Sequence, residues 1–277
     1  HDLYIQNNQV AAVRQSDETQ IGAMLPIIFL QNNWAVQLAL IQQNSQAAIL
    51  NSPLNPLLDS ENQMLGMSLN YDSSKRWPLA ISKTQGRSMR LTWENQDVLD
   101  SDYTGNTVSL NWREYFALGK QNVLATQINA AQADDHAQAF QLGGTQAHVP
   151  ADLLAGINMD TRFNIRDFPL RGYDNTLSEL FGRKMLSASL EWRFPLLRPE
   201  RGIMAPPLSL QTLSGALFID SGDAWNGGAS FSTLTGVGLE LNAEMRFGYL
   251  FAVFLRIGYA FGLNDLGVEQ TYVCIVS

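Results

Sequence analysis

Residues 185–196 read Met-Leu-Ser-Ala-Ser-Leu-Glu-Trp-Arg-Phe-Pro-Leu, with apolar and polar side chains in alternation along almost the whole stretch. Leu190 and Trp192 fall on one side of it, and Glu191 and Arg193 fall on the other. Because a β-strand points successive side chains to opposite faces, this alternation predicts a strand with one apolar and one polar surface.

The same alternation recurs along most of the chain, and its strongest further series are 65–72, 108–118, 237–247 and 251–261. Together the series give about 12–13 strands of roughly ten residues, the length that a tilted strand needs to cross a bilayer. The sequence therefore predicts an all-β, antiparallel transmembrane β-barrel with a wet, polar lumen. A soluble β-sandwich also alternates, but the strand length, the strand number and the charges repeated along one face favour the membrane barrel.

Composition narrows the possible functions. The chain has 18 Lys and Arg against 26 Asp and Glu, a formal net charge of -8. Phosphate binding needs clustered cations, so we expect no nucleic-acid partner. The single Cys274 excludes an internal disulfide framework and a cysteine-based metal site. No apolar run reaches the ~18 residues of a spanning helix. No signal peptide is visible, and we expect the chain to be a processed or trimmed piece of a longer precursor.

Several segments interrupt the alternation. We expect loops at 51–63 and 72–86, where prolines and polar residues gather. The apolar phase slips by one residue between Leu210 and Leu213, which predicts a β-bulge. Pro26 lies inside an apolar run and predicts a bulge or an edge position, because proline cannot donate to a sheet ladder.

The longest non-strand stretch, about 145–183, contains Leu170-Arg171-Gly172-Tyr173. Loops of that length are unusual unless they are functional. Taken alone, Arg171 reads as a solvated loop cation beside a glycine turn. A second interpretation joins it to Glu191 and Asp220, which lie on the polar faces of strands adjacent in sequence. A planar guanidinium pairs with a carboxylate through two parallel hydrogen bonds, so the two carboxylates are candidate acceptors.

Two other patterns could carry chemistry. Asp134-Asp135-His136 looks like a metal or catalytic cluster, but it is flanked by small polar residues and more often such a stretch is a solvated turn. Neither His136 nor His148 has a nucleophile motif nearby. Gly236-Val237-Gly238 is weak as a phosphate loop because no helix follows it, and it fits positions where another backbone approaches the wall. We predict no catalytic residue, no metal site and no cofactor.

Four segments stand in order along the second half of the chain: Phe140-Gln141-Leu142-Gly143-Gly144, Leu170-Arg171-Gly172-Tyr173, Leu190-Glu191-Trp192-Arg193-Phe194-Pro195-Leu196 and Phe218-Ile219-Asp220-Ser221-Gly222-Asp223. Together they resemble the C-terminal barrel of the bacterial surface antigen superfamily, the family of the BamA and TamA barrels. The resemblance covers about 140–277 well, and the preceding segments only as alternating strands.

The resemblance implies that the long loop folds into the barrel lumen and places its motif, Leu170, Arg171, Gly172 and Tyr173, on the inner wall. The wall partners that it implies are Glu191, Arg193, Asp220, Gly222 and Asp223. Gly172 would allow a sharp loop tip, and Tyr173 would pack beside the arginine.

The resemblance further implies a sixteen-stranded barrel with five strands after the loop. We expect these five at about 184–197, 208–221, 233–247, 250–262 and 267–277, and about eight before the loop, which leaves about three N-terminal strands of a family barrel missing. We treat the chain as one domain, with N-terminal strands at 1–146, the lumen loop at 147–183 and the last five strands at 184–277.

Two features depart from the family pattern. Family members usually carry a soluble module ahead of the barrel, and none is visible here. Their last strand normally ends in an aromatic residue, whereas this chain stops at Ser277.

By resemblance, the protein is an integral outer-membrane barrel of a Gram-negative bacterium that inserts outer-membrane proteins or translocates polypeptides. Its partners would be outer-membrane lipids, client or secreted polypeptides and periplasmic accessory proteins. The mechanism would be physical rather than catalytic, with a weak seam between the first and last strands at which a client strand adds. The alternatives are a passive porin-like channel, a membrane anchor for an N-terminal module, and an outer-membrane enzyme, for which the sequence shows no catalytic site.

Overall fold

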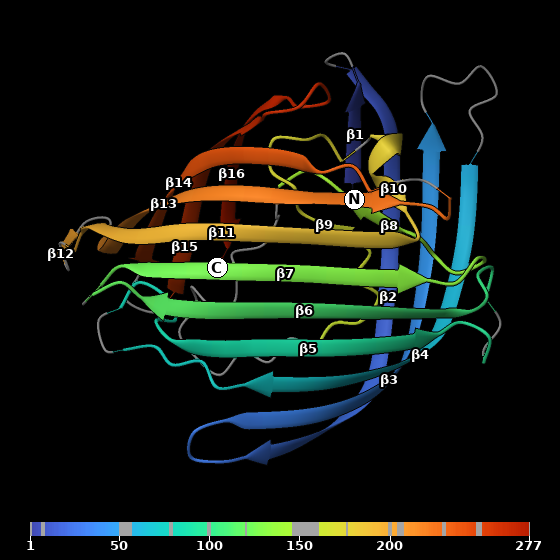
Figure 1. Ribbon diagram of the computed structural model, residues 1–277, viewed down its shortest axis with the longest axis horizontal. Helices are drawn as coiled ribbons and strands as arrows, with labels where there is room; N and C mark the ends of the chain where they lie inside the picture. The colour runs from blue at the N-terminus through green and yellow to red at the C-terminus, as the bar shows by residue number, and fades with distance from the viewer. Residues whose placement is uncertain are drawn as a thin grey trace.

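The protein folds as one strongly curved β-sheet whose long strands run side by side (Figure 1). This computed structural model describes residues 2–6, 9–49, 57–77, 80–98, 101–119, 121–145, 161–175, 177–198, 201–203, 208–228, 231–247 and 251–276. Across these ranges there is no helix long and apolar enough to cross a membrane.

A 13-stranded sheet forms the wall, and its strands pair in the order β1-β2-β3-β4-β5-β6-β7-β11-β13-β14-β15-β16, with the short β12 beside β13. All of these neighbours are antiparallel. The wall strands are β1 (Asp2–Gln6), β2 (Gln9–Ile28), β3 (Asn33–Ile49), β4 (Leu57–Asp72), β5 (Gly86–Asn95), β6 (Asn106–Ala117), β7 (Val123–Ala133), β11 (Lys184–Leu197), β12 (Arg201–Ile203), β13 (Leu208–Trp225), β14 (Leu234–Phe247), β15 (Phe251–Gly262) and β16 (Glu269–Val276).

The two faces of the wall have opposite character. On β11, Leu190 and Trp192 are 40% and 45% exposed, whereas Ser187 and Arg193 are 4% and 7% exposed. A soluble sandwich would bury the apolar face instead, because apolar side chains make its core. An outward apolar band around a polar interior is the arrangement of a membrane-crossing barrel. The predicted all-β, antiparallel, barrel-type fold is confirmed.

Between β7 and β11 the chain leaves the wall. The two strands still pair directly, from Lys184 opposite Gln132 to Arg193 opposite Val123. The connection between them builds a separate three-stranded sheet in the order β10-β8-β9. Its elements are β8 (Phe140–Leu142), β9 (Asp167–Phe168), the 3-10 helix η1 (Ser178–Leu180) and β10 (Phe181–Gly182).

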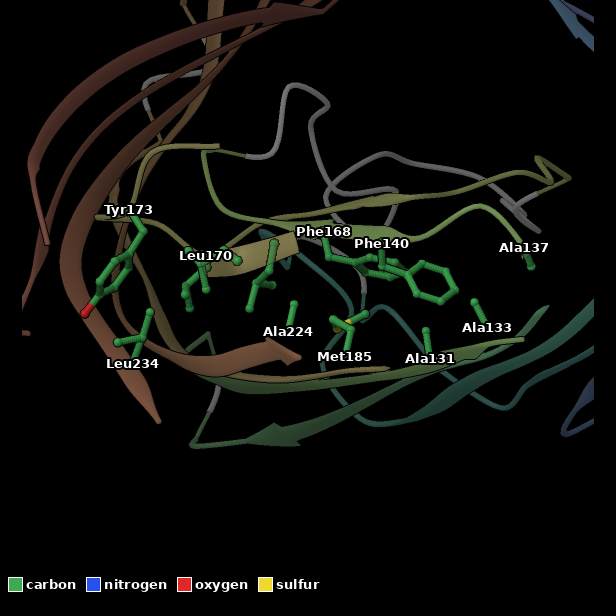
Figure 2. Packing of buried hydrophobic residues seen from close by; sticks show 12 residues of the cluster. Ala131, Ala133, Ala137, Phe140, Phe168, Leu170, Tyr173, Met185, Ala224 and Leu234 are labelled. Atoms are coloured by element: carbon green, nitrogen blue, oxygen red, sulfur yellow. The ribbon is translucent and has the colours of Figure 1, made fainter. Parts of the chain in front are cut away.

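This inserted sheet packs on the inner surface of the wall. Phe140, Phe168 and Leu170 of the connection point toward Met185 of β11 and Ala224 of β13 (Figure 2). Leu170 and Phe140 are completely buried. The largest apolar cluster of the described chain therefore lies between the inserted connection and the wall, and it holds the connection inside the curve of the sheet.

The structure corrects two predicted strand limits and the location of one predicted strand. Residues 57–63, expected as loop, belong to β4, because they continue the ladder with β3 although their side chains do not alternate. β13 runs to Trp225 rather than ending near 221. Of the eight strands expected before the loop, seven lie in the wall, and β8 lies in the inserted sheet.

Two predicted irregularities are confirmed. The ladder between β13 and β14 shifts register between Leu210 and Thr212, where the apolar phase slips. Pro26 lies in β2 at a position that pairs with Ala35 of β3. On the other side, β2 pairs with β1 only through Gln9–Arg14, so within the described residues Pro26 is on an edge of the sheet, a position where proline is tolerated.

Candidate functional site

Arg171 lies at the centre of a buried ion cluster on the inner wall. Its Nε and Nη2 donate to the two carboxylate oxygens of Asp220 at 2.6 and 2.7 Å, a two-pronged pairing. Its Nη1 lies 2.9 Å from Oε1 of Glu191 and 2.8 Å from Oε1 of Glu240. The guanidinium carbon stands 3.5 Å from the centre of the Phe218 ring. Carboxylates from β11, β13 and β14 thus converge on one loop cation.

The electrostatic balance of this cluster fixes the charge of the arginine. Burial acts to lower the pKa of the Arg171 guanidinium, but the carboxylates of Asp220, Glu191 and Glu240 outweigh it and hold that pKa well above its usual value. Arg171 is only 4% exposed. A permanently charged group at this depth is stable only while its carboxylate partners remain in place.

Glycines allow the loop backbone to approach the wall. Gly172 has a φ of 92°, in the left-handed region, and a Cβ there would lie 2.6 Å from the backbone nitrogen of Gly262. A Cβ on Gly236 would lie 1.9 Å from the carbonyl oxygen of Arg171. Gly236 is therefore a place where the loop backbone approaches the wall closely, as its sequence context indicated.

Tyr173 extends the contact to the last two hairpins. Its hydroxyl oxygen lies 2.8 Å from the carbonyl oxygen of Thr235 and 2.9 Å from Oδ1 of Asn264. Gln270 of β16 accepts from the backbone N–H of Gly172 at 3.0 Å and donates to the backbone oxygen of Tyr173 at 2.9 Å. The motif thus binds wall elements from β11 through β16.

The wall residues predicted from the sequence divide into two groups. Glu191 and Asp220 contact Arg171 directly. Arg193 instead donates to Oε2 of Glu191 at 2.9 Å through Nε and 2.6 Å through Nη2, so it acts one step away from the motif.

Gly222 and Asp223 serve the wall rather than the motif. Asp223 is three residues from Asp220 and so belongs to the opposite strand face. It accepts a hydrogen bond at 2.6 Å from the backbone N–H of Ser232, in its own hairpin. A Cβ on Gly222 would meet the carbonyl oxygen of Leu186 on β11 at 2.7 Å. For these two residues, the expected direct contact with the loop is replaced by packing within the wall.

Sequence reasoning missed Glu240 and Arg256 as members of the cluster. The Nη2 of Arg256 and the hydroxyl of Tyr272 both donate to Oε1 of Glu240, which also binds Arg171. Arg256 is 2% exposed. Both residues lie on the polar faces of their strands, so the signal was present as charges on the inner faces of consecutive strands.

The Asp134-Asp135-His136 stretch is an exposed turn in the structure. Oδ2 of Asp134 accepts from the backbone N–H of Asn106 at 2.9 Å, and Asp135 pairs with Arg183 at 3.0 Å. In the part of the chain that the structure describes, no three His, Cys, Asp or Glu side chains are grouped to hold a metal ion. His148 lies outside the described residues.

An apolar outer band, a polar inner face and an inserted loop tied down by a buried arginine define the class of outer-membrane β-barrels with an occupied lumen. The comparison with family models is more specific. The model of the Omp85 superfamily domain matches residues 2–265. The chain belongs to the Omp85 superfamily, in agreement with the predicted family of BamA and TamA barrels, and at this level it is an outer-membrane barrel.

Among solved structures, the chain is similar to BamA from Haemophilus ducreyi lacking POTRA domains 1-3, with 14% sequence identity and a TM-score of 0.58. The match covers 95% of this chain and 54% of that chain, so this chain spans about half the length of that structure. At this identity the likeness shows the fold alone. No curated protein matches the sequence.

Proposed function

We propose that this barrel inserts outer-membrane proteins into the membrane or moves polypeptides across it, and that the inserted loop holds the wall in the working conformation. Membership of the Omp85 superfamily supports the class of function. The observation that carries the proposal is the buried cluster in which Arg171 joins carboxylates of β11, β13 and β14. This contact lets one loop stabilise several neighbouring strands beside the end of the sheet.

In this proposal, the client polypeptide binds at the two ends of the sheet. Among the described residues, β1 pairs only with β2 and β16 only with β15, so no ladder joins β1 to β16. Unpaired backbone groups are costly in hydrocarbon, so a free strand edge in the membrane favours pairing with another strand. An unfolded client strand would gain main-chain hydrogen bonds there.

Reconstitution of the full-length protein tests the proposal. Lipid vesicles with and without the protein receive an unfolded small outer-membrane barrel as client, and the folded fraction is followed by heat-modifiable mobility. We expect vesicles with the protein to fold the client faster. Arg171→Lys should lose most of this acceleration, because lysine keeps the charge but not the planar, two-pronged geometry.

Arg87→Lys provides the matched control. Arg87 pairs with Glu114, and it forms no ion pair or hydrogen bond with the described part of the loop. Equal client folding with and without the protein, together with solute-selective ion conductance, would instead support the porin-like alternative.

A further inference from the structure

The loop segment that precedes the motif, residues 161–168, is called the loop limb, and it packs on the β3–β6 part of the wall. Phe163 is 3% exposed and packs with Ala39, Ile41 and Met64 of β3 and β4. A Cβ on Gly66 of β4 would lie 2.5 Å from the Phe163 ring, so the ring rests directly on the glycine.

A second buried ion pair holds this limb. Nη2 of Arg166 lies 2.5 Å from Oε2 of Glu94 on β5, and the two side chains are 8% and 3% exposed. The same carboxylate oxygen accepts from the hydroxyl of Thr107 on β6 at 2.9 Å. The other oxygen, Oε1, accepts from the backbone N–H of Asn164 at 2.7 Å. Glu94 therefore binds the loop twice and the neighbouring strand once.

Two further contacts hold the loop limb in the same position. The side-chain amide of Asn164 donates to Oε1 of Gln43 on β3 at 2.7 Å. The guanidinium carbon of Arg166 stands 5.4 Å from the centre of the Phe140 ring in the inserted sheet. The limb is thus fixed to β3, β5 and β6 by polar contacts, and to β3 and β4 by an apolar one.

The two anchors are close in sequence but bind different parts of the wall. Arg166 binds β5, and Arg171, five positions later (171 − 166), binds β11, β13 and β14. A fully extended chain covers at most about 3.6 Å per residue, so five residues reach at most about 18 Å. The Cα atoms of the two anchors cannot separate beyond this reach, so the two parts of the wall stay within it, plus the lengths of the anchoring side chains, while both anchors hold.

We infer that Arg166 and Glu94 form a second positioning pair, and that the loop is a cross-brace that sets the spacing between the β3–β6 and β11–β16 parts of the wall. Three carboxylates lie within ion-pair distance of the Arg171 guanidinium, and the Tyr173 contacts lie beside it. Among the described residues, one ion pair, with Glu94, holds Arg166, and its neighbours Phe163 and Asn164 add uncharged contacts. The Arg166 anchor is the weaker one, so it releases first and the loop stays with β11–β16. This inference deepens the proposed function, because it identifies the contact that yields when the barrel opens.

Distance measurement between spin labels tests the brace. Spin labels are attached at three positions: Leu91 on β5, Leu239 on β14 and the exposed Asn175 on the loop. Leu91 and Leu239 face outward and are 48% and 52% exposed. Each variant carries two of the three labels, and all variants also carry Cys274→Ser. In Glu94→Gln, we expect the 91–239 and 91–175 pairs to gain a longer-distance population, raised at least about tenfold over the parent (about 1.4 kcal/mol). The 175–239 pair should keep its parent distance.

Glu114→Gln is the matched control. Glu114 also joins β5 to β6 through an ion pair, with Arg87, but its side chain forms no ion pair or hydrogen bond with the described part of the loop. The three label distances in Glu114→Gln should equal those of the parent. Arg166→Lys is a milder second variant, used if Glu94→Gln no longer gives the heat-modifiable, folded form. It should lengthen the same two label distances, 91–239 and 91–175. Unchanged distances in the folded variants would overturn the inference. Since no client is present, this readout is independent of whether the barrel proves to insert proteins.

Discussion

Replacing Arg171 with alanine should lower the free energy of unfolding of the barrel by about 3–5 kcal/mol, because the change leaves buried carboxylates without their cation. Asp220 loses two charge-assisted hydrogen bonds, and Glu191 and Glu240 lose one partner each. The measurement is urea-induced unfolding in lipid vesicles, with the folded fraction read from heat-modifiable mobility.

An exposed arginine provides the comparison. The Arg87 side chain is 48% exposed and pairs with Glu114 at 3.0 Å. Arg87→Ala should cost less than about 1 kcal/mol, since exposed ion pairs contribute little. Equal losses for the two variants would mean that the cluster around Arg171 does not stabilise the barrel.

The second large effect is expected from Gly236→Ala. The added methyl group would lie 1.9 Å from the carbonyl oxygen of Arg171, which is a backbone atom and cannot rotate away. Either β14 or the loop tip must move, and the ion cluster moves with it. We expect a loss of about 3 kcal/mol or more in unfolding free energy, at the upper end of overpacking effects.

Gly227→Ala is the control for this change, because a Cβ on Gly227 meets nothing within 4 Å. The same urea titration should place it within about 0.5 kcal/mol of the parent protein. If Gly236→Ala unfolds at the same urea concentration as Gly227→Ala, the loop tip does not lie against β14 in the membrane.

Much of the wall could be predicted from the sequence because alternation is a local signal. The five predicted strands after the loop lie within a few residues of their observed limits, and from Leu186 to Trp192 of β11 the exposed side chains are the apolar ones. Where both faces are polar, as in 59–63 of β4, alternation disappears and a strand reads as a loop. β8 also alternates, yet it lies off the wall.

The candidate site could be predicted only in part. Alternation tells which face a side chain occupies, and a shared face made Glu191 and Asp220 plausible partners of Arg171. It does not tell which inward residues meet across the lumen. Arg166 and Glu94 are 72 positions apart in the sequence. Their contact depends on how the inserted sheet lies on the wall, which no local pattern records.

A double-mutant cycle on Arg171 and Asp220 tests most directly whether the loop is anchored to the inner wall by this ion pair. The unfolding free energies of Arg171→Ala, Asp220→Ala and the double variant are compared with that of the parent in the same vesicles. The structure predicts a coupling of about 2 kcal/mol or more, with the double variant far less destabilised than the sum of the single ones. Simple additivity of the two single changes would show that the pair is not formed in the membrane and would contradict the account.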